Sequence, residues 1–496
     1  MIRAFRSVAA ALTIAGLASG CAVGPNFRRP AAPAVSSYTR PSFPGTTTSV
    51  DVAGGQAQML GQGQDVPHDW WTLFQSPGLN GLVDQALRAS PTLIAAQQAL
   101  RQTMQLVYAQ RGAFFPTIEA SASANRTKTS ATIAPPTVLP SDTLTLYALQ
   151  ANLSFTPDVF GGNRRLVESL LGQAEAQRFQ LEAAYVALTA NVVAATVQEA
   201  SLRAQLSAAR EIIAISTRSL ALVRRQFELG AVAGLDVAAQ EAALAQVEQT
   251  LPPLQKQLEQ NRDLLIALLG RLPGDDPEVA FELASFQLPT DLPVSVPSRL
   301  VEQRPDVRAA EAQLHAASAQ IGVAVANRLP QFTITAAYGG TSTAFTQMFA
   351  NGNPFWTIAA NVAQTIFDAG TLWFRQRAAE AAFEQAAAQY RSTVITGFQN
   401  VADVLYALQS DAESLRAAVA AERAAKRTLD ITLKQQELGA VSYLALLNAR
   451  QAYQQALISR SQAQASRLAD TAALFQALGG GWWNRPAAPT AKATDR

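Results

Sequence analysis

Two long stretches of the chain repeat apolar residues at intervals of three and four, the period of a helix with one apolar face. The first spans residues 163–229, with no proline and only one glycine, Gly172; the second spans residues 372–438, with only Gly397 inside. At ~1.5 Å per residue each helix would be ~100 Å long if unbroken. Because this exceeds the core of any globular domain, the pattern predicts long helical hairpins, as a soluble coiled-coil scaffold or as the wall of a tube.

Shorter helical segments accompany the long ones, at residues 91–114, 235–269, 305–327 and 443–478. Pro252 and Pro253 lie inside the second of them. Proline removes a backbone donor and clashes with the preceding turn, so we expect a kink or a break there. The matching positions of the last segment are Ser461 and Gln462, so the two segments differ at this point.

Other segments alternate apolar and polar residues with the period of two that is typical of a half-buried strand. They are residues 117–126, 143–155, 332–342 and 355–366. In the first, Ile118 and Ala120 fall on one face, and Glu119 and Ser121 fall on the other. Each segment has about the length of a tilted membrane strand, ~9–11 residues, and such alternation is typical of transmembrane barrels.

Beyond the N-terminus, no uninterrupted apolar stretch reaches the ~20 residues of a membrane helix. A membrane crossing would therefore be a closed barrel, because open strand edges are not tolerated in lipid. Four strands are fewer than the about eight of the smallest barrels, so several copies of the chain would have to share one. The alternative is a set of short soluble strands in a periplasmic sandwich.

The chain also contains a repeat. The string ELGAV occurs at residues 228–232 and 437–441, and Gly270 and Gly479 each lie 40 residues beyond the glycine of their copy. Residues 90–116 align with 304–330 in the same way. A tandem duplication predicts two equivalent structural units. The expected segments are a signal peptide at 1–20, a lipidated tail at 21–68, a first repeat at 69–272, an inter-repeat segment at 273–297, a second repeat at 298–480 and a C-terminal tail at 481–496.

Composition excludes several classes of function. The net charge is +2, which indicates no basic face for nucleic acid. A single cysteine excludes an internal disulfide and any paired-cysteine site, and the two histidines, His68 and His315, lie far apart in sequence. Nucleophile elbow, phosphate-binding loop, zinc-protease and dinucleotide motifs are absent from the sequence, so we expect neither an enzyme nor a metal or other cofactor.

The cysteine is informative through its position. Arg3 and Arg6 precede an apolar run at residues 8–17, which is too short to span a membrane and is typical of a secretory signal. The run ends in small residues and Cys21, similar to a bacterial lipobox, in which lipid is attached to the cysteine after cleavage. Ala18 departs from the leucine that is commoner there, and ordinary cleavage that leaves a free thiol is the alternative. Ala22, in place of aspartate, favours the outer membrane.

Several strings resemble those of the outer-membrane efflux proteins, specifically the outer-membrane factor lipoproteins of tripartite resistance-nodulation-division pumps. The resemblance covers nearly the whole chain after the cysteine. It is carried by both ELGAV strings and by GCAVGPNFRRP at 20–30, DWWTLFQSPGLNGLVDQAL at 69–87, FGGNRR at 160–165 and RPDVRAAEAQL at 304–314.

This resemblance implies a mainly α-helical homotrimer with a small β part. Each chain would give four strands to a shared twelve-stranded barrel in the outer membrane, and its helices would continue as a hollow periplasmic tunnel. Residues 273–297, the N-terminal tail and the end after Gly479 would form a mixed belt around the tunnel. The implied partners are outer-membrane lipid, a periplasmic adaptor protein and, through it, an inner-membrane transporter.

The implied function is a passive exit duct of an efflux pump that exports drugs or other small molecules. The alternatives are a channel for type I secretion or metal efflux, and a non-conducting periplasmic lipoprotein scaffold. The lipoprotein signal and the GPNFRRP string favour the pump lipoproteins. Cargo is not readable from the sequence, because in such assemblies the inner-membrane transporter selects it.

In the family, the ELGAV turns are the periplasmic tips of the hairpins and meet the adaptor. The resemblance therefore assigns adaptor contacts to Leu229, Gly230, Val232, Leu438, Gly439 and Val441. The alternative for the glycines is that they only make the turn.

Family members narrow the tunnel with polar or charged residues just after these turns. Asp236 and Asn448 are accordingly the constriction candidates, and Ala445, at the position that matches Asp236, departs from a double ring of carboxylates. The alternative for Asp236 is a favourable interaction with the helix macrodipole.

Overall fold

The computed structural model describes residues 22–40, 45–128, 143–275 and 279–486. The chain divides into two compact units. The sheet unit contains the described residues of Met1–Arg29, Ala99–Gln177 and Ala310–Tyr390; the helical unit contains those of Pro30–Gln98, Arg178–Ala309 and Arg391–Arg496. The chain is mainly helical, as the periodicity predicted.

The main helices lie within a few residues of their expected bounds: α3 (Pro91–Arg111), α4 (Gly162–Glu228), α5 (Gly234–Leu268), α7 (Pro305–Ala326), α8 (Thr371–Glu437) and α9 (Tyr443–Ala477). Helices α4 and α8 each contain 67 residues, and α5 and α9 each contain 35. Two short helices, α2 (Pro77–Ala89) and α6 (Pro297–Gln303), were not expected. Both begin with proline, whose fixed φ suits the first helical position.

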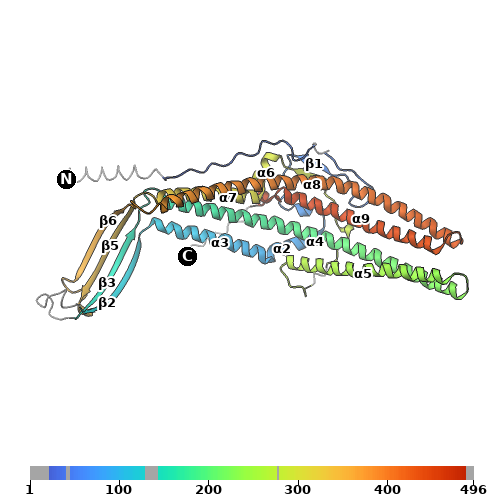
Figure 1. Ribbon diagram of the computed structural model, residues 1–496, viewed down its shortest axis with the longest axis horizontal. Helices are drawn as coiled ribbons and strands as arrows, with labels where there is room; N and C mark the ends of the chain where they lie inside the picture. Colours follow the sequence, from blue (N-terminus) through green and yellow to red (C-terminus); the bar gives the residue numbers. More distant parts are fainter. Residues whose placement is uncertain (1–21, 41–44, 129–142, 276–278, 487–496) are drawn as a thin grey trace. The chain divides into compact units, whose positions relative to one another are not determined.

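Four strands of the sheet unit form one antiparallel sheet, in the order β2 (Thr117–Lys128), β3 (Thr143–Phe155), β5 (Gln331–Ser342) and β6 (Pro354–Ala363) (Figure 1). These strands coincide with the segments of alternating polarity. Strand β6 ends at Ala363, earlier than the expected residue 366. Ala363 pairs with Gln331, the first residue of β5, and the preceding Pro330 has no backbone N–H to extend the ladder.

Helices α4 and α7 approach closely in the sheet unit because small residues line their contact. A Cβ atom on Gly172 of α4 would lie 3.0 Å from the carbonyl oxygen of Ala312 and from the backbone nitrogen of Ala316, both in α7. Ala174 and Ala176 are buried on the same stretch of α4. The high alanine content of the sequence therefore corresponds to close helix packing.

An aromatic cluster is at the centre of the helical unit's core. Trp70 lies in the short 3-10 helix Trp70–Phe74, is fully buried and stacks on Phe475 of α9, with 5.1 Å between ring centroids. Around this pair pack buried residues of α2, α4 and α8, among them Leu82, Val193 and Leu408. The core therefore joins segments that are far apart in sequence.

The N-terminal segment and the inter-repeat segment meet in the helical unit. Strand β1 (Met59–Gln62) pairs in parallel with β4 (Asp291–Val294). The fully buried Arg467 of α9 holds the same N-terminal segment, because its Nη1 donates to the carbonyl oxygen of Gly54 and its Nη2 to that of Gln56 at 2.7 Å. The chain end docks here too, through Trp482, whose Nε1 donates to the carbonyl oxygen of Gln303 at 2.7 Å.

Helix α5 is continuous through Pro252 and Pro253, so of the expected kink or break the break is wrong, and the kink stays a prediction. The reason is packing on both sides of the prolines. Leu251 and Leu254 pack against a small buried cluster formed by Leu202, Leu206 and Leu258 of α4 and α5. These contacts keep the two flanking turns aligned while the prolines forgo their backbone hydrogen bonds.

Among the described residues, α4 contains an 18-residue window with a mean hydropathy of 1.2, long and apolar enough to cross a membrane by composition alone. Half of that window is buried inside the protein. Burial of this kind is typical of a core helix in a packed bundle.

Candidate functional site

The strand register divides the sheet into an apolar face and a polar face. Directly opposite residues of antiparallel strands share a face. One row across the four strands therefore contains Ile118, Leu153, Ala336 and Ile358, and the next row, on the opposite face, contains Glu119, Asn152, Ala337 and Thr357. We call the side that bears Ile118 and Ile358 the apolar face.

The apolar face is uncovered in the single chain. Ile358 is 72% exposed and Trp356, two residues away on the same face, is 71% exposed. Contiguous exposed apolar residues of this kind mark a contact with lipid or with another protein. The apolar face of the sheet is therefore a candidate contact surface.

Strands β2 and β6 lie at the two edges of this sheet. Within the described part of the chain, neither pairs with a further strand on its outer side. Exposed edges of this length present unpaired backbone donors and acceptors. Both edges of the sheet are therefore open to pairing with further strands.

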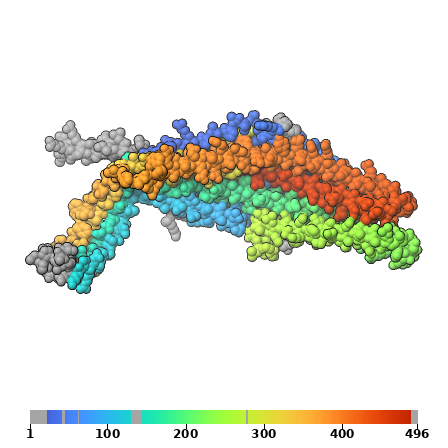
Figure 2. Space-filling model, in the orientation of Figure 1, coloured from blue at the N-terminus to red at the C-terminus, as the bar shows by residue number. Residues whose placement is uncertain are grey.

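The two ELGAV strings form the turns of two helical hairpins, α4–α5 and α8–α9, which lie side by side in the helical unit (Figure 2). Gly230 and Gly439 have φ angles of 71° and 72°. Only glycine adopts this left-handed conformation without steric cost, so the turn by itself requires both glycines.

The apolar tip residues are exposed. Leu229 is 69% exposed and Leu438 is 84% exposed, whereas Val232 and Val441 are half-buried. Leu235 and Leu444, which the sequence interpretation did not include, are also exposed in the first turns of α5 and α9. The sequence could have identified both residues, because each is a large apolar residue that follows shortly after a turn. Together these leucines give each tip an apolar surface.

Both constriction candidates lie near the tips, but they differ in local role. The Asp236 side chain accepts a hydrogen bond from the backbone N–H of Ala233 at 3.1 Å, so it caps the first turn of α5. The corresponding cap of α9 is Ser442, whose Oγ accepts from the backbone N–H of Ala445. Asn448 is an exposed residue of α9. Asp236 therefore has a capping role that the sequence interpretation did not include, beside the expected alternatives of a constriction and a macrodipole interaction.

Cys21, the candidate for lipid attachment, lies outside the described residues. The described chain continues from Ala22, whose neighbour Val23 donates its backbone N–H to the carbonyl oxygen of Phe160 at 3.0 Å. In the described part of the chain, no three His, Cys, Asp or Glu side chains converge as a metal site would require.

A pair of carboxyl groups in the helical unit escaped the sequence interpretation. Asp411 of α8 and Asp470 of α9 are neighbours, and both are half-buried. Burial, together with a hydrogen bond and the like charge from Asp470, raises the pKa of Asp411 to about 7, against an ordinary value of 3.8, although Arg467 acts in the opposite direction. No sequence pattern could reveal this pair, because its members come from different helices.

Comparison with known proteins relates this architecture to a single family. The family described as "Outer membrane efflux protein" matches residues 82–271 and 296–480. The toluene efflux pump outer membrane protein TtgF of Pseudomonas putida is 30% identical over 482 residues, which cover 95% of this chain and 96% of that protein.

Two further similarities agree with this match. The pyoverdine export outer membrane protein OpmQ of Pseudomonas putida is 29% identical over 442 residues, covering 87% of this chain and 92% of that protein. Among solved structures, the outer-membrane channel OprN has a TM-score of 0.80 and 26% identity, covering 93% of this chain and 100% of that one. The chain therefore belongs to the outer membrane efflux protein family and is an outer-membrane component of an efflux system.

Proposed function

We propose that three copies of this chain share one transmembrane β-barrel and form the exit duct of a tripartite efflux pump. The observation that carries the proposal is the four-stranded sheet with one exposed apolar face and two open edges. Three such sheets supply twelve strands, above the about eight needed for the smallest membrane barrels. Threefold symmetry closes the barrel, because β2 of one copy then pairs with β6 of the next.

The helices form the tunnel wall below the barrel. The equal lengths of α4 and α8, and of α5 and α9, support a tandem duplication in which each repeat supplies one hairpin and two strands. Three chains then contribute six hairpins around a common axis. The polar face of the sheet lines the water-filled interior, and the apolar face contacts lipid.

The hairpin tips are the proposed contact with a periplasmic adaptor, and the adaptor connects the duct to an inner-membrane transporter. Leu229, Val232, Leu438 and Val441 supply apolar contact area, while Gly230 and Gly439 allow the backbone to reverse direction. The four exposed or half-buried apolar side chains are more than the turn itself requires. A docking partner accounts for them.

Asp236 and Asn448 are the proposed constriction residues. Each lies near the start of its helix, close to a tip, where the tunnel would be narrowest. A carboxylate ring from three chains would favour cations over anions at that point. Asp236 combines this role with its hydrogen bond to the backbone of Ala233.

Lipid on Cys21 is the proposed second membrane attachment, and no other cofactor is required. Small organic molecules are the proposed cargo, in keeping with relatives named for pyoverdine export and toluene efflux. A channel for type I secretion or metal efflux would share the barrel but serve another transporter. Susceptibility of a deletion strain to small toxic compounds distinguishes these clients.

The decisive experiment measures assembly and conduction together. The protein is extracted in detergent, its mass is measured by light scattering, and it is then incorporated into planar bilayers. We expect a trimer that resists dissociation in mild detergent and forms discrete conducting channels. A detergent-free, water-soluble monomer without conductance would contradict the proposal and favour the scaffold alternative.

A further inference from the structure

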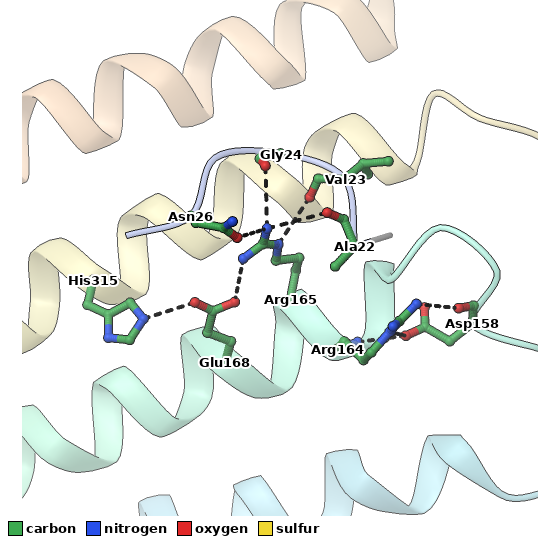
Figure 3. Close-up of polar contacts among 9 residues, drawn as sticks. All are labelled: Ala22, Val23, Gly24, Asn26, Asp158, Arg164, Arg165, Glu168 and His315. Carbon is green, nitrogen blue, oxygen red and sulfur yellow. Dashed lines mark hydrogen bonds and ion pairs between the residues drawn. The ribbon is translucent and has the colours of Figure 1, made fainter. Parts of the chain in front are cut away.

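The first described residues of the chain lie against the sheet unit. We call residues 22–29 the N-terminal strap. Figure 3 shows the strap lying along α7, with the Arg165 side chain of α4 directed into it. Val23 donates its backbone N–H to the carbonyl oxygen of Phe160, which lies between β3 and α4. The strap is therefore held next to the point where the sheet joins the helices.

Arg165 makes most of the polar contacts to the strap. Its Nε donates to the carbonyl oxygen of Val23 at 3.0 Å, and its Nη2 donates to Asn26 Oδ1 at 2.7 Å. The same Nη2 lies within hydrogen-bond distance of the carbonyl oxygens of Ala22 and Gly24. Four acceptors on one short segment thus converge on a single guanidinium group.

The remaining side of the guanidinium is occupied within the sheet unit. Arg165 Nη1 donates to Glu168 Oε2 at 2.8 Å, and Glu168 Oε1 lies 2.9 Å from Nε2 of His315 on α7. The His315 ring in turn stacks on Phe27 of the strap, with 4.5 Å between centroids and 15° between planes. A second set of contacts therefore leads from Arg165 back to the strap.

Two further contacts hold the strap against α7. Arg29 forms an ion pair with Glu311 of α7 at 3.0 Å. A Cβ atom on Gly24 would lie only 2.4 Å from the Cα atom of Gly322, and Gly24 has a φ of 91°, so glycine at this position allows direct backbone contact with α7. The strap is consequently seated by backbone shape as well as by charge.

Arg165 is buried beneath the strap, so its hydrogen bonds with the strap are shielded from water. Its side chain is only 6% exposed. A buried guanidinium is costly unless its donors are satisfied, and the strap supplies four of its acceptors. Undocking would exchange these hydrogen bonds for bonds to water, and a hydrogen bond to a charged group makes a net favourable contribution to stability, so the contacts of Arg165 favour the docked strap.

We propose that Arg165 is a positioning residue that clamps the N-terminal strap to the sheet unit and thereby fixes where the membrane anchor leaves the protein. The anchoring role rests on the proposed attachment of lipid to Cys21. Ala22 packs on Gly161, where a Cβ would lie 2.6 Å from the Ala22 Cα atom. Ala22, the residue that follows the proposed lipid-bearing cysteine, therefore lies beside the β3–α4 junction, at the base of the strands that we propose enter the membrane.

Trypsin cleavage of the full-length protein in detergent tests the clamp directly. Arg28 and Arg29 are exposed, but trypsin binds the residues on both sides of the cleaved bond in an extended conformation, so cleavage between them requires local undocking of the strap. We expect Arg165→Gln to accelerate this cleavage at least about tenfold, the change expected from one lost hydrogen bond to a charged group. The matched control is Arg164→Gln, which removes the neighbouring guanidinium that binds Asp158 and should change the rate less than about twofold.

A second variant, with a smaller effect on the fold, distinguishes loss of the clamp from misfolding. Asn26→Ala removes a strap-side acceptor and leaves Arg165 in place, so the fold is retained while the cleavage rate rises. Equal cleavage rates for the parent, Arg165→Gln and Asn26→Ala would overturn the clamp. Because this measurement does not require lipid, it remains decisive in a Cys21→Ala background, even if Cys21 proves unmodified by mass spectrometry.

The anchoring role has a separate readout. The yield of heat-resistant trimers in membranes is measured for Arg165→Gln with Cys21 present and with Cys21→Ala. A positioning role predicts that Arg165→Gln lowers the yield only when Cys21 is present, so the two effects are not additive. An equal fractional loss in both backgrounds would show that Arg165 only stabilises the fold and would overturn the anchoring role.

Discussion

Asp411 of α8 is a half-buried carboxyl group that lies next to Asp470 of α9 in the helical unit. The pKa of Asp411 is raised to about 7 in the folded protein, mainly by burial and then by Asp470, from 3.8 in its ordinary state. Folding therefore takes up a proton between about pH 4 and 7. Over that interval the contribution of this pair to stability falls as the pH rises, because deprotonation leaves two adjacent negative charges.

Asp411→Asn removes this dependence. We expect the melting temperature of the variant, relative to the parent, to rise between about pH 4 and pH 7 and to level off above that, because the amide carries no charge to be buried or to repel Asp470. Thermal unfolding followed by circular dichroism at each pH provides the measurement. A difference between variant and parent that stays constant with pH would contradict the raised pKa.

Asp236→Asn separates the capping role of this residue from its proposed role in the constriction. The amide oxygen can still accept the hydrogen bond from the Ala233 N–H, but the negative charge is lost. If the side chain lines the pore, cation preference in planar bilayers should fall while thermal stability changes by less than about 1 kcal/mol. Asn448→Ala, which alters no charge, should leave the ion preference unchanged. Unaltered selectivity of Asp236→Asn would assign the residue to capping alone.

Periodicity in the sequence predicted most of the strands and helices, but not where each of them ends. Alternation located β2, β3 and β5, and three-four spacing located α4 and α8, because an element that buries one face must repeat its apolar residues with its own period. The end of β6 depended on its neighbour, since Pro330 limits the ladder beyond Gln331. Continuity of α5 through its prolines depended on the leucine cluster shared with α4. Both outcomes are set by partners rather than by local sequence.

Ile358→Arg tests the apolar face of the sheet. The residue lies in the row that contains Ile118, Leu153 and Ala336, so a charge there would face lipid. At the centre of a bilayer we expect a cost of about 2–4 kcal/mol. Urea titration of the protein in lipid vesicles provides the measurement.

Thr357→Arg is the matched control, because it places the same charge one residue away on the polar face. We expect it to be tolerated, with unfolding close to that of the parent protein. Equal destabilisation by Thr357→Arg and Ile358→Arg would contradict the assignment of the faces.

At the scale of the whole molecule, the sheet edges and the hairpin tips are two surfaces that the single chain leaves open. The edge strands β2 and β6 are open to pairing with other copies of the chain, as the proposed trimer requires, and the tips present leucines to the surroundings. Assembly should consequently occur in two separable steps, trimer formation through the strands and pump formation through the tips. A variant that affects only one surface should block only one step.

Leu438→Ala affects the tips alone. Because Leu438 is 84% exposed, its truncation should leave the trimer intact, whereas loss of an apolar contact should weaken adaptor binding by about tenfold or more. Cross-linking to the adaptor and drug susceptibility of the host provide the measurements. The control is Leu264→Ala, an equally conservative change at an exposed position of α5 distant in sequence from the turn. Wild-type resistance in the Leu438→Ala strain would remove this residue from the contact.

The sequence alone determined the six main helices and their approximate lengths, the four strands of the antiparallel sheet and the positions of the two helical turns. These features depend on local periodicity and on glycines that must adopt positive φ, and both can be read one segment at a time. Family membership also followed from the sequence, because the short strings that carry the resemblance are contiguous and can be recognised without the structure.

Only the tertiary structure decided which distant residues meet. The parallel pairing of β1 with β4, the carboxyl pair of α8 and α9, and the convergence of the N-terminal strap on Arg165 each join segments far apart in the chain. The physical reason is that the burial and the hydrogen bonds of a residue depend on which other segments of the chain surround it. A buried arginine has no signature in the sequence, because its low exposure and its acceptors are both supplied by other parts of the fold.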